Sequence, residues 1–268
     1  VASWLDLAVN PVVRDVHAGC LAVSPLRTSP PVHVLSDEKF AQLNREQIYL
    51  FLVSQEELIW YTEWMERTDE ASFNDVIMNA LGSIERAVQR EDVLPSDTSY
   101  TPESVTTDGW KPAQTAWETQ VPGIALNECL LHGRKRVDVT LDEYAKAYPD
   151  LSNEARQSLK EQFNHIFQAP SLAAFSQRLR RMIDHYHEDP ILLKRLTILK
   201  QKRFLFTNHL KFDKAPAFSS ALDRSMRFLD EKLQSFGQFR APESLDPMLN
   251  AWAIVNNLRS FLPDAKKA

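Results

Sequence analysis

The amino-acid sequence predicts a mixed α/β fold in which a large all-helical insertion and a helical C-terminal region accompany a sheet. Two observations lead to this prediction. Short, apolar, β-branched segments crowd into the first half of the 268-residue chain, with helical segments between them. From residue 140 to residue 262 the apolar spacing is helical almost throughout, and single prolines interrupt it.

The predicted sheet has five strands. VHVL at 32–35 follows a proline-rich break, and QIYLFLV at 47–53 is apolar on both faces, which is typical of a central strand. Residues 57–64 come so soon after it that we expect a hairpin. Ser104 to Thr107 and residues 124–128 complete one mixed sheet.

Helices fill most of the remaining chain. An N-terminal helix is expected over 1–23, and residues 72–90 place their apolar side chains on one stripe that can cover the sheet. A short helix at 113–119 connects the last two strands. The second half should contain helices at roughly 141–147, 152–168, 171–187, 191–207, 218–236 and 245–261.

This order of elements implies four segments along the chain. Residues 1–31 form an N-terminal helical remnant and linker, and residues 32–137 form the α/β core. Residues 138–215 form the helical insertion, and residues 216–268 contribute C-terminal helices that complete the core. No run of 18 or more apolar residues occurs, so we expect no membrane span.

Charge and cysteine content restrict the functional class. The net charge of −5 argues against a protein that is basic all over, as many nucleic-acid proteins are. Only Cys20 and Cys129 occur, so a reducing cytoplasm is expected and not a disulfide framework. Positive charge gathers in the second half, which favours a surface that contacts phosphate groups. The expected DNA contacts are Arg134, Lys135, Arg136, Arg178, Arg181, Lys194, Arg195, Lys202 and Arg203.

Two aspartates each follow a predicted strand. Asp37 comes just after 32–35, and Asp108 comes just after 104–107. If these strands are neighbours, both carboxylates emerge at one edge of the sheet. Hard divalent cations prefer such oxygen ligands, and two ions can clamp the attacking and leaving oxygens of a phosphodiester. An isolated aspartate after a strand is more often a turn or cap residue, so only the combination indicates this chemistry.

Several motifs together resemble one enzyme family. VLSDEKF followed by QIYLFLVSQEELIWYTEW is similar to the opening of the catalytic domain of bacterial insertion-sequence DDE transposases. SVTTDGW resembles the segment around their second catalytic aspartate, and ALDRSMRFLDEKL resembles the helix that carries the third acid. NAWAIVNNLRSF resembles their closing helix. The resemblance implies an RNase H-like fold and metal-dependent DNA cleavage followed by strand transfer.

The resemblance also implies the site residues. Three aspartates would be catalytic and would bind two Mg²⁺ or Mn²⁺ ions: Asp37, Asp108 and Asp223. Arg227, one turn after Asp223, matches the basic residue that follows the third acid in the family. Most family members use glutamate as the third acid, so Asp230 and especially Glu231 remain alternatives on the same predicted helix.

The motif Cys129-x-x-His132 occurs in several branches of the family. There it implies an accessory role, with a buried cysteine and a histidine that contacts the active site or the DNA backbone. As an alternative, these two side chains could bind zinc. A structural zinc site needs four ligands, however, and the chain offers no second cysteine pair.

The resemblance implies double-stranded DNA as the partner, both as element ends and as target. It further implies a homo-oligomer on DNA, located with the nucleoid in a bacterial cytoplasm, and no membrane partner. Two other functions stay open. One is a truncated or domesticated transposase that binds DNA without catalysis, which the acidic pI of about 5.8 favours. The other is a helical protein-interaction module, consistent with the helix-rich segment 140–262.

Overall fold

The computed structural model describes residues 29–43, 45–90, 98–236 and 242–259. The predicted helix over 1–23, most of the predicted segment 1–31, and Cys20 therefore lie outside the described residues. The chain divides into two compact units. The sheet unit comprises the described residues within 1–105, 110–124 and 220–268, and the helical unit comprises residues 106–109 and 125–219.

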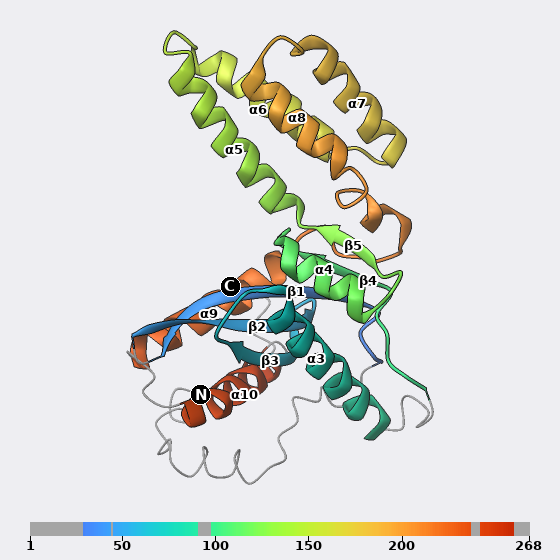
Figure 1. Ribbon diagram of the computed structural model, residues 1–268, viewed down its shortest axis with the longest axis vertical. Helices are drawn as coiled ribbons and strands as arrows, with labels where there is room; N and C mark the ends of the chain where they lie inside the picture. The colour runs from blue at the N-terminus through green and yellow to red at the C-terminus, as the bar shows by residue number, and fades with distance from the viewer. Residues whose placement is uncertain (1–28, 44, 91–97, 237–241, 260–268) are drawn as a thin grey trace. The chain divides into compact units, whose positions relative to one another are not determined.

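The five predicted strands are present and form one five-stranded sheet (Figure 1). They are β1 (His33–Leu43), β2 (Glu46–Gln55), β3 (Leu58–Met65), β4 (Ser104–Thr107) and β5 (Ala125–Glu128). Their order across the sheet is β3-β2-β1-β4-β5, and β1, β2 and β3 pair in antiparallel fashion. The predicted hairpin is confirmed, since only Glu56 and Glu57 separate β2 from β3. The α/β fold class predicted from the sequence is therefore confirmed.

Strand β1 is much longer than its sequence suggests. The polar run from Ser36 to Lys39 carries no hydrophobic alternation, so the predicted strand ended at Leu35. In the structure β1 pairs with β2 from Leu35 opposite Ser54 to Leu43 opposite Glu46. Backbone hydrogen bonds to the apolar strand β2 hold this polar segment in the sheet. Asp37 consequently lies inside β1, opposite Leu52, and the prediction that it follows the strand is wrong.

Both faces of the sheet unit are covered by helices. On one face Leu50 and Leu52 of β2 belong to a core cluster with residues of α9 (Ser220–Phe236) and α10 (Pro242–Arg259). On the other face Phe51 meets Phe73 of α3 (Glu70–Arg90) edge-on, with ring centroids 6.2 Å apart. Because neighbouring residues of β2 point to opposite faces and both are buried, the prediction of a central strand is confirmed.

Side chains of two helices form hydrogen bonds to strands of the sheet unit. Trp117 of α4 (Lys111–Gln120) is fully buried and donates from Nε1 to the hydroxyl of Ser36, at 3.2 Å. At the edge strand β3, the Asn257 side chain accepts from the amide of Ile59 and donates to its carbonyl, both at 2.8 Å. Asn257 thus pairs backbone groups that an edge strand would otherwise leave open.

The helical unit is built from four α-helices. They are α5 (Leu130–Ala147), α6 (Asn153–Phe167), α7 (Leu172–His185) and α8 (Pro190–Gln201), followed by the 3₁₀ helix η1 (Asn208–Lys211). The side chains of Ser152, Ser171 and Asp189 cap the starts of α6, α7 and α8. Buried phenylalanines form much of the core: Phe163, Phe167, Phe175 and Phe206.

Two helix boundaries differ from the prediction. Helix α5 begins at Leu130 and not near residue 141, because Leu130, Val137 and Leu141 face the core although basic residues interrupt the apolar pattern. Helix α8 ends at Gln201 and not at residue 207, and the chain then turns, with the amide of Thr207 bonded to the carbonyl of Phe204. Within the described ranges, no helix has the length and apolar character needed to cross a bilayer.

The buried face of α9 should set the stability of the sheet unit. Leu222 is fully buried in the cluster between α9 and the sheet, so Leu222→Ala should lower the free energy of unfolding by about 2–5 kcal/mol in urea titrations. The control is Arg224→Ala, two residues on, whose exposed ion pair with Glu57 should contribute no more than about 1 kcal/mol. Equal losses for the two variants would contradict this packing.

Candidate metal centre

The side chain of Asp37 is directed by the alternation of β1. Leu35 belongs to the core cluster shared with α9 and α10, whereas Ser36 bonds Trp117 on the opposite face. Because successive side chains of a strand point to opposite faces, Asp37 and Lys39 extend on the same side as Leu35, toward α9. Asp37 is half-buried there, and its Oδ1 accepts from the amide of Glu38 at 2.9 Å.

Helix α9 presents a matching row of side chains to β1. Residues 223, 227 and 230 recur at helical spacing and so share one side of the helix. Together the two elements line an open pocket of about 230 Å³, and its lining residues are Asp37, Glu38, Lys39, Asp223, Met226, Arg227 and Asp230. Two of the three predicted acids, Asp37 and Asp223, thus meet in one pocket although they are far apart in the chain.

The charges of this pocket suit a divalent cation. Lys39 binds Asp230, with Nζ 2.5 Å from Oδ2, so these two charges largely compensate each other. Asp37 and Asp223 then share the pocket with the single remaining lining cation, Arg227, while Glu38 lines it from the neighbouring position of β1. The pocket keeps an excess of negative charge and offers carboxylate oxygens, which are the ligands that Mg²⁺ and Mn²⁺ prefer.

The three alternatives for the third acid are placed differently. Asp223 lies in the first turn of α9 and lines the pocket with Asp37. Asp230 lines it as well but is bound to Lys39. Glu231 is exposed and does not line the pocket. The structure thus places Asp223 and Asp230, but not Glu231, at the pocket with Asp37.

The second predicted acid directly follows β4. Asp108 is half-buried and belongs to the helical unit, where its carbonyl oxygen accepts from Nη2 of Arg136 at 2.6 Å. Strand β4 is the neighbour of β1 in the sheet, and at its start the Ser104 hydroxyl lies 3.0 Å from Nδ1 of His33. The predicted adjacency of the two strands that lead to Asp37 and Asp108 is therefore confirmed.

The sequence analysis missed a buried carboxylate in the helical unit. Glu128, at the end of β5, is only 1% exposed and is bound by both Arg136 and Lys202. Both cations are among the predicted DNA contacts, and in the structure they bind Glu128. A charged residue inside the apolar run ALNECLL was the signal that could have revealed it, because a buried charge requires a partner.

Cys129 lies in a polar setting although it is fully buried. Its amide donates to the carbonyl of Thr107 at 2.8 Å, and its Sγ accepts from the amide and hydroxyl of Ser219 at 3.3 and 3.2 Å. Burial raises the pKa of the Cys129 thiol, but hydrogen bonds from His132 and Ser219 outweigh it, so the pKa lies below its ordinary value. In the part of the chain that the structure describes, no cluster of three metal-binding side chains includes Cys129 or His132.

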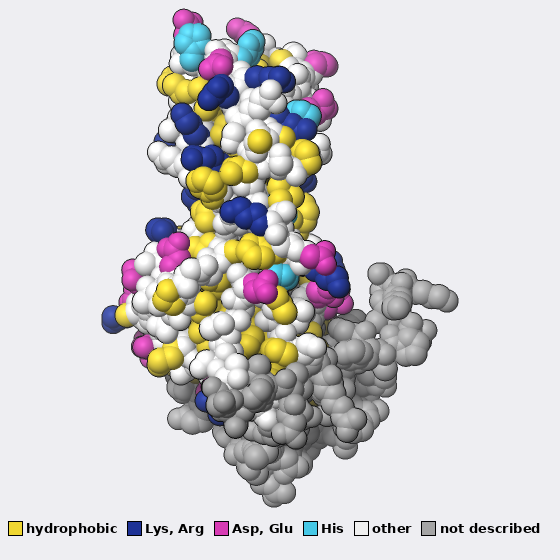
Figure 2. Space-filling model, turned by 90° about the vertical axis from the view of Figure 1, so that its right-hand side faces the viewer, with side chains coloured by type: hydrophobic (Ala, Val, Ile, Leu, Met, Phe, Trp, Pro, Cys, Tyr) yellow, Lys and Arg dark blue, Asp and Glu magenta, His cyan; other side chains and the backbone are white. Residues whose placement is uncertain are grey.

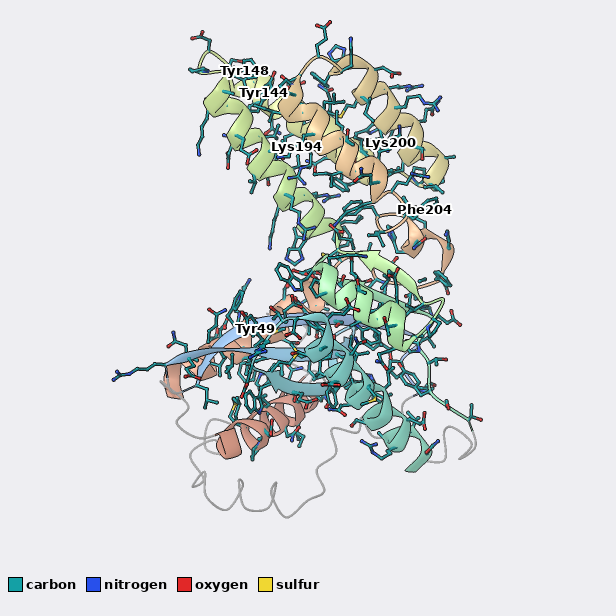
Figure 3. The ribbon with its side chains drawn as sticks, in the orientation of Figure 1. Tyr49, Tyr144, Tyr148, Lys194, Lys200 and Phe204 are labelled. Atoms are coloured by element: carbon teal, nitrogen blue, oxygen red, sulfur yellow. The ribbon has the colours of Figure 1, made fainter. Side chains whose placement is uncertain are left out.

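The predicted DNA-binding residues of the helical unit differ in exposure. Lys135, Arg181 and Lys194 are exposed, and Lys194 and Lys200 project from α8 (Figure 3). Further lysine and arginine side chains are visible on the upper part of Figure 2. The other six are half-buried: Arg134, Arg136, Arg178, Arg195, Lys202 and Arg203. Arg178 donates to a carbonyl of α6, and Arg195 donates to Thr140. Of the nine predicted DNA contacts, only Lys135, Arg181 and Lys194 are therefore well exposed.

Comparison with known proteins adds no identification. No known family model matches the chain, and no curated protein shows significant similarity to it. The function has to be inferred from the geometry and chemistry of the residues described above.

The thiol of Cys129 gives a pH-dependent prediction. A group whose pKa is depressed by folding stabilises the folded state above its unfolded pKa, and this contribution is lost as the pH falls through the folded pKa. An unfolded thiol titrates near about 8.5. The wild type should therefore gain stability relative to Cys129→Ser as the pH rises from about 7 to about 9, measured as the difference between their free energies of unfolding. Urea titrations at several pH values measure it, and a difference that stays flat or shrinks would contradict the assignment.

Proposed function

We propose that this protein is a DDE-type DNA transposase, which cleaves and joins DNA strands in a metal-dependent reaction. The observation that carries the proposal is the meeting of Asp37 and Asp223 in one open, acidic pocket. The neighbouring positions of β1 and β4 support an RNase H-like sheet, in which the first and fourth strands lie side by side. The resemblance of the motifs around all three aspartates supports the same function.

In this proposal the carboxylates of Asp37, Asp108 and Asp223 bind two Mg²⁺ or Mn²⁺ ions. Bound ions of this kind polarise a phosphodiester and activate water as a nucleophile. The remaining pocket residues have separate tasks. Arg227 is exposed at the pocket and can neutralise phosphate charge with its guanidinium. Lys39 holds Asp230 and thereby keeps that carboxylate from competing for the ions.

Double-stranded DNA is the proposed partner. The exposed cations Lys135, Arg181 and Lys194 of the helical unit supply phosphate contacts that do not depend on sequence. We further propose that the protein acts as a homo-oligomer on paired element ends in a bacterial cytoplasm, as the family resemblance implies.

A second candidate is a transposase-derived protein that binds DNA but does not cut it. One observation favours it, since the cation Arg227 lines the pocket beside the carboxylates. Positive charge next to a metal site weakens cation binding. The two candidates differ in whether the purified protein cleaves DNA when Mg²⁺ or Mn²⁺ is present.

Cleavage of labelled DNA that carries element ends tests the enzyme. Asp37→Asn and Asp223→Asn should each lower the cleavage rate at least about 100-fold, since the loss of one ligand removes several kcal/mol of transition-state stabilisation. The matched control is Glu231→Gln, which should cleave at the wild-type rate because Glu231 lies outside the pocket. Cleavage by Asp223→Asn together with inactivity of Glu231→Gln would move the third acid to Glu231. DNA binding without cleavage by the wild type would establish the second candidate.

Salt dependence tests the DNA-binding surface. The logarithm of the association constant should fall steeply with the logarithm of salt concentration between about 50 and 200 mM, with a slope near −0.9 for each phosphate contact. The variants Arg181→Gln and Lys194→Gln should each reduce this slope by about 0.9. Lys160→Gln is the control, because Lys160 is bound to Asp138 at 2.7 Å. Unchanged slopes in both test variants would place the DNA elsewhere.

A further inference from the structure

The backbone that follows the proposed second acid is tightly enclosed. Gly109 has φ 96°, which is in the left-handed region, and a Cβ atom there would lie 2.5 Å from the carboxyl carbon of Glu128. The main chain after Asp108 therefore packs directly against the Glu128 carboxylate. The position of the Glu128 carboxylate therefore restricts the position of this turn.

Glu128 is itself held from two sides. Its Oε1 binds Nη1 of Arg136, in the second turn of α5, and its Oε2 lies 2.7 Å from Nζ of Lys202, the C-cap residue that follows α8. Each carboxylate oxygen thus has its own cation. Because the carboxylate is only 1% exposed, both partners are needed to compensate for the water that it has lost.

Arg136 connects this ion cluster to Asp108. While Nη1 binds Glu128, Nη2 of the same guanidinium donates to the carbonyl oxygen of Asp108 at 2.6 Å. The guanidinium is planar and rigid, so it fixes the Asp108 carbonyl relative to the Glu128 carboxylate. The preceding residue is fixed as well, since the carbonyl of Thr107 accepts from the amide of Cys129 and its hydroxyl accepts from the amide of Gly109.

We propose that Glu128, Arg136 and Lys202 are positioning residues for Asp108. These three residues come from separate segments of the helical unit, and the ion cluster that they form fixes the backbone of Asp108 and Gly109. The Cα position of Asp108, from which its carboxylate extends, is therefore fixed as well. This inference rests on the proposed function, because it gives Asp108 the role of a metal ligand. It also reassigns Arg136 and Lys202, which bind Glu128 and not DNA phosphate.

Arg136→Lys is the informative variant. Lysine keeps the positive charge but lacks the planar fork of two nitrogens, so it cannot fix the Asp108 carbonyl rigidly against the Glu128 carboxylate. The rate of DNA cleavage should fall by about 10- to 100-fold, as for residues that orient metal ligands, and the Mn²⁺ concentration for half-maximal rate should rise. The KM for DNA and the salt dependence of DNA binding should match the wild type. Arg156→Lys is the control, since it alters an arginine–aspartate pair at the surface of the same unit and should leave all four values unchanged.

Hydrogen–deuterium exchange of the full chain, without metal or DNA, tests the same cluster independently of catalysis. Amides of the segment 106–110 should exchange faster in Arg136→Lys than in the wild type, whereas those of α6 and α7 should not change. If α6 and α7 also exchange faster, the variant has destabilised the whole unit. Lys202→Gln is then tested in its place, and we again expect faster exchange at 106–110 alone. Both readouts use proteins that retain the native chain length.

The outcomes separate the two proposals. Wild-type exchange at 106–110 in the variant, a wild-type cleavage rate, or a rate loss matched by an equal loss of DNA affinity would each overturn the positioning role. A wild-type protein that never cleaves DNA would overturn the proposed function instead. In that case faster exchange at 106–110 would still show that the cluster holds this turn, but not that the turn serves catalysis.

Discussion

The packing of α9 against β1 is the contact on which the candidate site depends. Leu35 and Leu222 are both buried in the cluster between these elements, so neither the strand nor the helix can rotate its apolar side away. The strand's two-residue period then fixes Asp37 toward the helix, and the helical period brings Asp223 to the same side. The acidic pocket is a consequence of apolar burial, and its carboxylates need no contact of their own to bring them together.

The electrostatics of the chain are local, and the net charge of −5 hides them. In the sheet unit, four acids and two cations share one pocket, and one ion pair removes Lys39 and Asp230 from the balance. In the helical unit, Glu128 is buried and takes two cations out of the basic surface. Pairing therefore decides which charges can act on a ligand, and both sites depend on it.

Much of the fold could be predicted from the sequence, because its signals are local. Alternation and apolar runs indicated all five strands, and proline and helical spacing indicated most helices. The extension of β1 through the polar residues Ser36 to Lys39 could not be predicted, since pairing with β2 and not local pattern maintains it. The ion cluster at Glu128 was not predicted either. A basic residue in the sequence looks the same whether its side chain binds a buried acid, as Arg136 and Lys202 do, or a DNA phosphate. Asp223 was predicted from the order of motifs, but its place in one pocket with Asp37 depends on the packing of α9 against β1, which no local pattern encodes.

The most direct test of the central claim is a crystal structure of the protein soaked with Mn²⁺, with the metal located by anomalous scattering. We expect anomalous density between the carboxylates of Asp37 and Asp223, within about 2.0–2.6 Å of their oxygens, with Asp108 as a further ligand. Density at other side chains, or none at this pocket with Mn²⁺ in excess, would contradict the assignment of a metal-dependent active site to the contact of β1 with α9.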